Sequence, residues 1–151
     1  MKFAHRITQG LLLAYLLLLG FTSLWPKPVD GGGLVRLVTS EILKFCQGIS
    51  WLKWLQYNQL EALANALLYL PLGVFLVVLF PKLKIWWALV IPVVVSIVAE
   101  GIQRYFLPAR YSTWDDVFHN ALGGVIGVVI SVSIRQLRKW RSAERSASPV
   151  E

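Results

Sequence analysis

Polar side chains concentrate in one passage of an otherwise apolar chain, Ala99 to Gly127, which reads "AEGIQRYFLPARYSTWDDVFHNALGGVIG". The passage combines carboxylates, arginines, amides and one imidazole. Carboxylates and imidazoles can move protons, and an arginine fork can hold a carboxylate or a phosphate at two points. Together with one amide from an earlier apolar segment, the passage predicts a polar pocket built from Asn65, Glu100, Gln103, Arg110, Asp116 and Asn120.

Each of these residues also has a purely structural interpretation. Glu100 lies four residues before Arg104, which is the favourable spacing for an ion pair on one helix. Asp116 falls near the expected start of a helix, where a carboxylate can cap the backbone and complement the helix dipole. Asn65 and Asn120 can hydrogen-bond between helices instead of contacting a ligand.

A catalytic interpretation uses the same residues. Glu100 or Asp116 would be the general base, His119 the acid and Arg110 a phosphate clamp. A metal site at His119 with Asp115 and Asp116 is a further alternative. However, the sequence shows no Ser-His-Asp arrangement, no phosphate-binding glycine loop, no nucleotide fingerprint and no Cys/His cluster with zinc spacing. We therefore favour binding over catalysis, and expect neither a metal nor a cofactor.

The elements that carry these residues are apolar enough to cross a membrane. Of the 151 residues, 56% are hydrophobic and 15% are charged, whereas soluble domains carry about 25% charged residues. Four blocks approach the roughly 20 residues that cross a bilayer, at about residues 7–25, 62–80, 85–107 and 117–134. The sequence thus predicts an all-α membrane protein, a four-helix bundle in one domain (residues 1–141) with a disordered tail (residues 142–151). The only cysteine, Cys46, excludes an internal disulfide.

Two further segments bear on the topology. The first block could be a signal peptide, but no small-x-small cleavage pattern follows, and "TSLWPKP" looks like an interfacial tryptophan and a helix stop, which favours a retained anchor. Between the first two blocks, apolar residues recur at three- and four-residue spacing over residues 34–52, which predicts an amphipathic helix on the outer membrane interface. A lid over the pocket is an alternative role for that helix.

The distribution of basic residues predicts the orientation. With four spans both termini lie on one side, and that side would carry nine of the lysines and arginines against six on the other. This bias places both termini in the cytoplasm. The basic stretch "RQLRKWR" (Arg135 to Arg141) is then a contact for anionic membrane lipids, and we do not expect nucleic-acid binding.

This topology brings the polar candidates to one level, in the outer leaflet. At a rise of about 1.5 Å per residue, Glu100 lies about 22 Å along a span that begins at Ile85, so roughly 8 Å short of the outer edge of the hydrocarbon. A charged group at that depth costs a few kcal/mol unless it is paired, so it should face the bundle interior. Helical spacing gives three inward faces: Glu61, Asn65, Tyr69 and Gly73; Ser96, Glu100 and Gln103; Asp116, Asn120, Gly123, Gly124 and Gly127.

Small residues and prolines suggest how the spans pack. Gly123, Gly127 and Ser131 form a seam that lets a neighbouring helix approach closely, either in the same bundle or in another subunit of an oligomer. Pro71 and Pro92 each remove one backbone hydrogen bond inside a span and permit a kink.

At these residues the chain resembles the VanZ-like family of small bacterial membrane proteins. The resemblance rests on Asn65 in "NALLYLPLG", on Glu100-x-x-Gln103, and on "RYSTWDDVFHNALGGVIG", in which Arg110, Asp116 and Asn120 are spaced by six and then four residues. It implies a location in the bacterial cytoplasmic membrane and an influence on sensitivity to the glycopeptide teicoplanin. The implied ligand is a lipid-linked glycan, a peptidoglycan precursor or a lipoglycopeptide. One departure is that residues 1–61 lack the Asp-Lys-x-x-His element of many relatives.

Overall fold

The computed structural model describes residues 2–24, 33–107 and 113–147, and over these ranges the chain is helical with no strand. Four helices are long and apolar enough to cross a membrane, which confirms the all-α class and the four predicted spans. The chain is therefore a multi-pass membrane protein. The elements in order are α1 (Lys2–Leu24), α2 (Gly33–Gln47), the 3-10 turn η1 (Ser50–Leu52), α3 (Tyr57–Leu79), α4 (Ile85–Phe106) and α5 (Trp114–Ala147).

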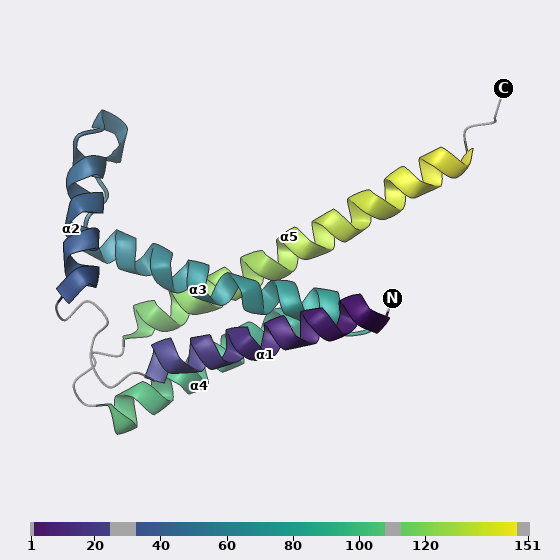
Figure 1. Cartoon of the computed structure of the whole chain (residues 1–151), viewed down its shortest axis with the longest axis horizontal. Coiled ribbons are helices and arrows are strands. Elements are labelled where there is room, and N and C mark those ends of the chain that lie inside the picture. Colours follow the sequence, from purple (N-terminus) through teal and green to yellow (C-terminus); the bar gives the residue numbers. More distant parts are fainter. Residues whose placement is uncertain (1, 25–32, 108–112, 148–151) are drawn as a thin grey trace.

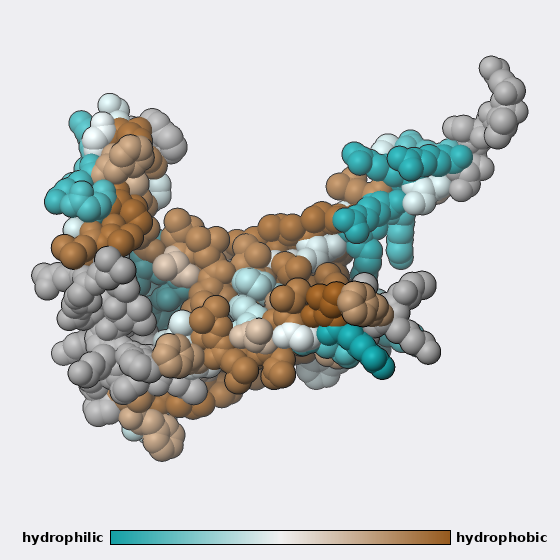
Figure 2. Space-filling model, viewed as in Figure 1, coloured by the Kyte–Doolittle hydropathy of each residue, from teal (hydrophilic) through white to brown (hydrophobic). Residues whose placement is uncertain are grey.

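The four long helices run lengthwise through the molecule (Figure 1). Helix α5 crosses α3 and continues well past the end of the bundle, whereas α2 lies across the opposite end. Both termini are directed toward the end that α5 extends, as an even number of crossings requires. Apolar side chains cover the length of the bundle and hydrophilic ones gather on the extended part of α5 (Figure 2), which is the distribution expected of helices that face lipid.

Three helices are longer than the spans that the sequence predicted, and the first of them, α1, begins at Lys2 rather than near residue 7. Helix α3 begins at Tyr57 rather than near residue 62, because Gln56 and Gln59 form a capping box in which the Gln56 amide donates to Oε1 of Gln59 at 3.0 Å. Helix α5 runs to Ala147, so the expected disordered tail is helical from residue 142 to residue 147. Arginine, lysine, alanine, leucine, glutamate and glutamine, which are strong helix formers, make up most of the stretch after the apolar block, and the helix therefore continues beyond that block.

Glycines allow α3 and α5 to pack backbone to backbone. A Cβ atom at Gly123 would overlap the Ala66 carbonyl, and one at Gly127 would overlap the Leu70 carbonyl. A Cβ at Gly73 would lie 2.6 Å from a backbone nitrogen of α5. Helix α3 of the same chain therefore fills the seam at Gly123 and Gly127.

The remaining helices pack around this pair. Pro92 of α4 is buried and its ring contacts Gly124 of α5, and α4 continues as a helix through the proline. Tyr15 of α1 donates its hydroxyl hydrogen to the Leu68 carbonyl of α3 at 2.9 Å. The buried core below the polar end is formed mainly by Leu19, Tyr69, Leu72, Leu76, Val77, Ala88 and Val128.

The predicted amphipathic segment is a helix that stands away from the bundle. Helix α2 covers residues 33–47, and a backbone turn at Gly48 leads into η1. Several of its apolar side chains, including Phe45 at 72% exposure, have no covering layer in the part of the chain described. Its polar side carries the ion pair between Glu41 and Lys44, at 2.7 Å.

Candidate functional site

Polar side chains from three helices meet where α3 and α5 begin and α4 ends. Asn65 comes from α3, Glu100 and Gln103 from α4, and Asp116 and Asn120 from α5. Glu100, Gln103 and Asn120 are 4–6% exposed, so these three residues face inward as predicted, whereas Glu61 on the predicted inward face of α3 is exposed. Arg110, the predicted ligand fork, lies outside the described residues.

Asp116 forms both a helix cap and a link between helices. Its Oδ2 accepts hydrogen bonds from the Thr113 amide at 3.1 Å and the Thr113 hydroxyl at 2.7 Å, and its own amide donates to Oγ1 of Thr113 at 3.2 Å. Its Oδ1 accepts a hydrogen bond from Nδ2 of Asn65 at 2.9 Å. The capping interpretation is therefore confirmed, and both carboxylate oxygens are engaged by protein groups. Asp116 positions the start of α5 against α3.

Glu100 is held inside the bundle by α5. Its Oε1 accepts a hydrogen bond from Nδ2 of Asn120 at 3.3 Å, with both side chains buried. The other polar atom of that amide, Oδ1 of Asn120, is buried and has no hydrogen-bond partner in the described part of the chain. A buried carbonyl oxygen without a donor costs about 1–3 kcal/mol. An unused acceptor thus lies beside a buried acid.

Ser96 adds a third link, one turn below Glu100. Its side chain is fully buried, and its hydroxyl donates to the Val117 carbonyl of α5 at 2.9 Å. With Gln103 it completes the polar stripe that α4 turns toward α5. Three separate polar contacts therefore fix α5 against its neighbours at this end.

Among the described residues two cavities open here, whereas the sequence predicted a single hollow. The first has a volume of about 290 Å³, lies between α3 and α5, and is lined by Asn58, Glu61, Ala62, Thr113, Asp115, Asp116 and His119. The second, the Glu100 cavity, has a volume of about 200 Å³, lies between α4 and α5, and is lined by Ile97, Glu100, Gly101, Arg104, Tyr105, Thr113, Trp114 and Val117. Thr113 lines both, so the first turn of α5 divides the space.

This division changes the chemistry that the residues can perform. His119 and Glu100 line different cavities, so they are not placed as an acid and a base acting on one substrate. Across the described ranges, no three His, Cys, Asp or Glu side chains lie close enough to hold a metal ion, and the metal site considered at His119 is not formed. The Glu100 cavity instead combines one carboxylate, Glu100, and one guanidinium, Arg104, with apolar and aromatic walls. These walls suit a polar group attached to a lipid.

Some of these residues were not predicted from the sequence. Thr113 is central to the site, and the pattern Thr113-x-x-Asp116 is a capping-box signature that could have identified it. Asn58 and Glu61 line the first cavity because α3 begins earlier than its hydropathy indicated. Helical spacing placed Glu61 on an inward face with Asn65, but no sequence pattern pointed to Asn58 as a lining residue.

The comparison with protein families identifies the chain. The family model described as VanZ/LLP1 matches residues 10–135, a range that contains the polar cluster and nearly all of the membrane-spanning part. The comparisons with curated proteins and with solved structures gave no match. The matched range covers most of the chain and agrees with the four-span architecture, and the protein therefore belongs to the VanZ/LLP1 family.

Proposed function

We propose that this protein binds the polar part of a cell-envelope molecule in the Glu100 cavity and thereby lowers the sensitivity of the cell to teicoplanin. The observation that carries the proposal is buried Glu100, which accepts a hydrogen bond from Asn120 and lines a cavity at the end of a membrane bundle. A buried acid in a membrane helix is costly, and such residues generally mark ligand or ion sites. Candidate ligands are a lipid-linked glycan, a peptidoglycan precursor or the lipoglycopeptide itself.

The size and walls of the cavity support a small polar group on a larger amphipathic molecule. Sites for whole drug-sized ligands have volumes of about 300–1,000 Å³, so a cavity of about 200 Å³ accommodates one sugar or amide-bearing group. Glu100, which lines the cavity, would accept hydrogen bonds from it, and Arg104 would contribute positive charge. Tyr105 and Trp114, which are 84% and 72% exposed, would lie against the attached chain.

Binding accounts for the site better than catalysis does. Both carboxylate oxygens of Asp116 accept hydrogen bonds from Thr113 and Asn65, which leaves this acid engaged in structure. Glu100 remains as a possible base, but His119 lines the other cavity. Ligand binding therefore accounts for these residues without a chemical step.

We further propose that the polar end faces the outside of the bacterial cytoplasmic membrane and that both termini are cytoplasmic. The excess of lysine and arginine on the terminal side supports this orientation. Helix α2, which lies at the polar end, would then rest in the outer headgroup region with its apolar residues directed into the lipid. Trp54, at 62% exposure, is an anchor suited to that depth.

Thiol labelling tests the orientation. In a Cys46→Ser background, Asn58→Cys places an exposed thiol at the polar end and Lys84→Cys places one in the α3–α4 turn. A reagent that cannot cross lipid should label the first variant in intact cells, and the second only after the cells are opened. Labelling of Lys84→Cys alone in intact cells would reverse the orientation and contradict an outer-leaflet site.

Substitution of Glu100 tests the function. Glu100→Gln keeps an oxygen that can accept from Asn120 but removes the negative charge, so the fold should be retained. Loss of one charge-assisted hydrogen bond, about 1.5–3 kcal/mol, should weaken ligand binding by about tenfold or more. The measurements are teicoplanin sensitivity of cells that express the protein and retention of labelled lipoglycopeptide or lipid-linked precursor by the purified protein.

The matched control is Glu144→Gln, the same change on the exposed, extended part of α5. It should leave both readouts at the wild-type level. If Glu100→Gln also leaves them unchanged at equal protein abundance, the Glu100 cavity is not the binding site.

A further inference from the structure

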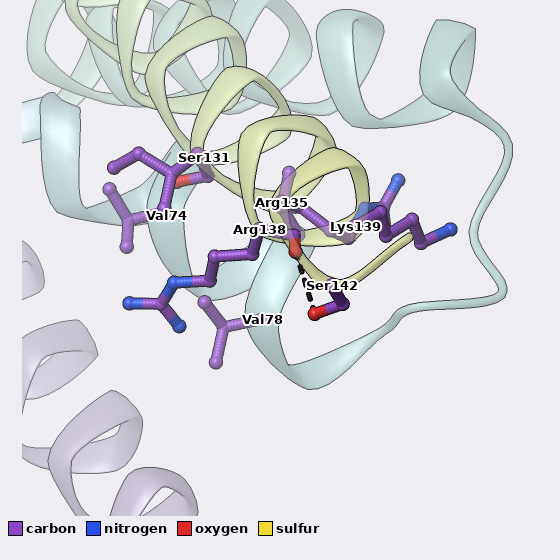
Figure 3. A pocket seen from close by; sticks show the side chains of 9 residues that line it. Val74, Val78, Ser131, Arg135, Arg138, Lys139 and Ser142 are labelled. Carbon is purple, nitrogen blue, oxygen red and sulfur yellow. Dashed lines mark hydrogen bonds between the residues drawn. The ribbon is translucent and has the colours of Figure 1, made fainter. Parts of the chain in front are cut away.

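A second groove lies at the opposite end of the bundle, between α3 and α5 (Figure 3). It has a volume of about 660 Å³ and is lined by Val74, Val77, Val78, Ser131, Ile134, Arg135, Arg138, Lys139 and Ser142. It lies farther along α5 than the Glu100 cavity and shares no lining residue with that cavity. The two sites can therefore be tested independently.

The close approach of the two helices explains why the groove exists. Gly123 and Gly127 bring the backbone of α5 against Ala66 and Leu70 of α3. Beyond this crossing the helices diverge, and α5 continues past the end of α3 at Leu79 (Figure 1). The divergence leaves a wedge whose walls come from the last turns of α3 and the middle of α5.

The two walls differ in chemistry. Helix α3 supplies valines, of which Val78 is 54% exposed, whereas α5 supplies three basic residues on one face, and no acidic residue lines the groove. In Figure 3 the Arg138 side chain extends toward Val78, and the Ser142 hydroxyl donates to the Arg138 carbonyl at 2.9 Å. The groove thus combines an apolar wall with an uncompensated positive rim.

The depth of the basic residues matches a lipid headgroup layer. About 20 residues of helix cross the hydrocarbon, so a span that begins at Trp114 leaves it near Ser133. Arg135 and Arg138 follow directly, at the level of lipid phosphates. The contacts of Gly123 with Ala66 and of Gly127 with Leu70 align Val78 with Arg135, at the boundary, and Val74 one turn deeper, at the level of the acyl chains. Arginine is well suited to phosphate because its planar guanidinium donates two parallel hydrogen bonds.

We propose that this groove binds one anionic phospholipid, with its phosphate between Arg135 and Arg138 and an acyl chain along the valines of α3. A general attraction of basic residues to an anionic surface would be spread over all five arginines and lysines of the extended helix. In the groove, by contrast, three of these basic residues lie on the face that meets the apolar wall, where an acyl chain can pack. The lipid fills the wedge and braces α5 against α3.

Native mass spectrometry of the full-length protein tests the proposal, with phosphatidylglycerol and phosphatidylcholine of identical chains. Phosphatidylglycerol should be retained at one molecule per chain and phosphatidylcholine should not. Arg135→Gln with Arg138→Gln should weaken retention about tenfold or more, since two charge-assisted contacts are lost. Arg141→Gln with Arg145→Gln removes the same charge from residues that do not line the groove and should change retention less than twofold.

A variant that fills the groove tests the contribution of the apolar wall separately from that of the basic residues. Val78→Trp keeps every basic residue and occupies the apolar wall at an exposed position, so it should reduce retention severalfold while thermal unfolding confirms that the protein is folded. If the two double arginine variants lose phosphatidylglycerol retention equally, the effect is one of diffuse charge and the proposal is overturned. It is also overturned if inorganic phosphate alone displaces the lipid completely, or if phosphatidylcholine is retained equally well.

Discussion

Gly123→Ala should destabilise the protein by about 2–3 kcal/mol and lower its unfolding temperature by about 5–10 °C, although it adds only one methyl group. Alanine is a better helix former than glycine by about 1 kcal/mol, so local propensity alone predicts the opposite sign. The new Cβ would overlap the backbone of Ala66, which cannot move as a side chain can. Helices α3 and α5 would have to separate along their longest contact.

The matched control is Gly101→Ala on α4. A Cβ at Gly101 meets no atom within 4 Å, so the same chemical change should be neutral or slightly stabilising. Thermal unfolding of the purified proteins in detergent measures both. If the two variants unfold at the same temperature, the backbone contact at Gly123 is not required for the fold.

Asp116→Ala should cost about 2 kcal/mol, the second-largest effect we expect. The substitution removes the capping box at the start of α5, which contributes about 1 kcal/mol, and the hydrogen bond to Asn65, which contributes about 0.6 kcal/mol in a membrane bundle. It also leaves the Asn65 amide without its acceptor. The first turn of α5, which separates the two cavities, should fray, so binding in the Glu100 cavity should weaken as well.

The neighbouring acid provides the control for Asp116. Asp115→Ala removes an exposed carboxylate from the same turn and loses only a helix-dipole contribution of about 0.3–1 kcal/mol. Combining Asp116→Ala with Asn65→Ala isolates the link between the helices, because the two costs should not add. Additive costs would show that the 2.9 Å contact contributes nothing to stability.

The polar cluster shows which parts of the site sequence reasoning could reach. Glu100, Gln103 and Asn120 were placed on inward faces from helical spacing and from the cost of burying polar groups in lipid, and all three are buried. The capping role of Asp116 followed from its position near a helix start. Each of these predictions uses only the spacing of residues within one helix, so it does not depend on how the helices pack.

The division of the site into two cavities depends on how helices meet. Spacing along α5 puts Asp116 and Asn120 on one side of the helix, but the partners of these residues come from different neighbours, Asn65 of α3 and Glu100 of α4. Periodicity specifies a face and not the helix that covers it. The partner of each side chain was therefore beyond the reach of the sequence.

The amino-acid sequence by itself determined the number of spans, the polar end of the bundle and the inward faces, because the cost of placing polar groups in hydrocarbon acts on each segment separately. The tertiary structure alone decided that the seam at Gly123 and Gly127 is filled by α3, that α5 stays helical to Ala147, and that the diverging helices leave a groove at Arg138. These features depend on the crossing and divergence of two helices. Interhelical geometry arises from contacts between residues far apart in the chain, which no local pattern encodes.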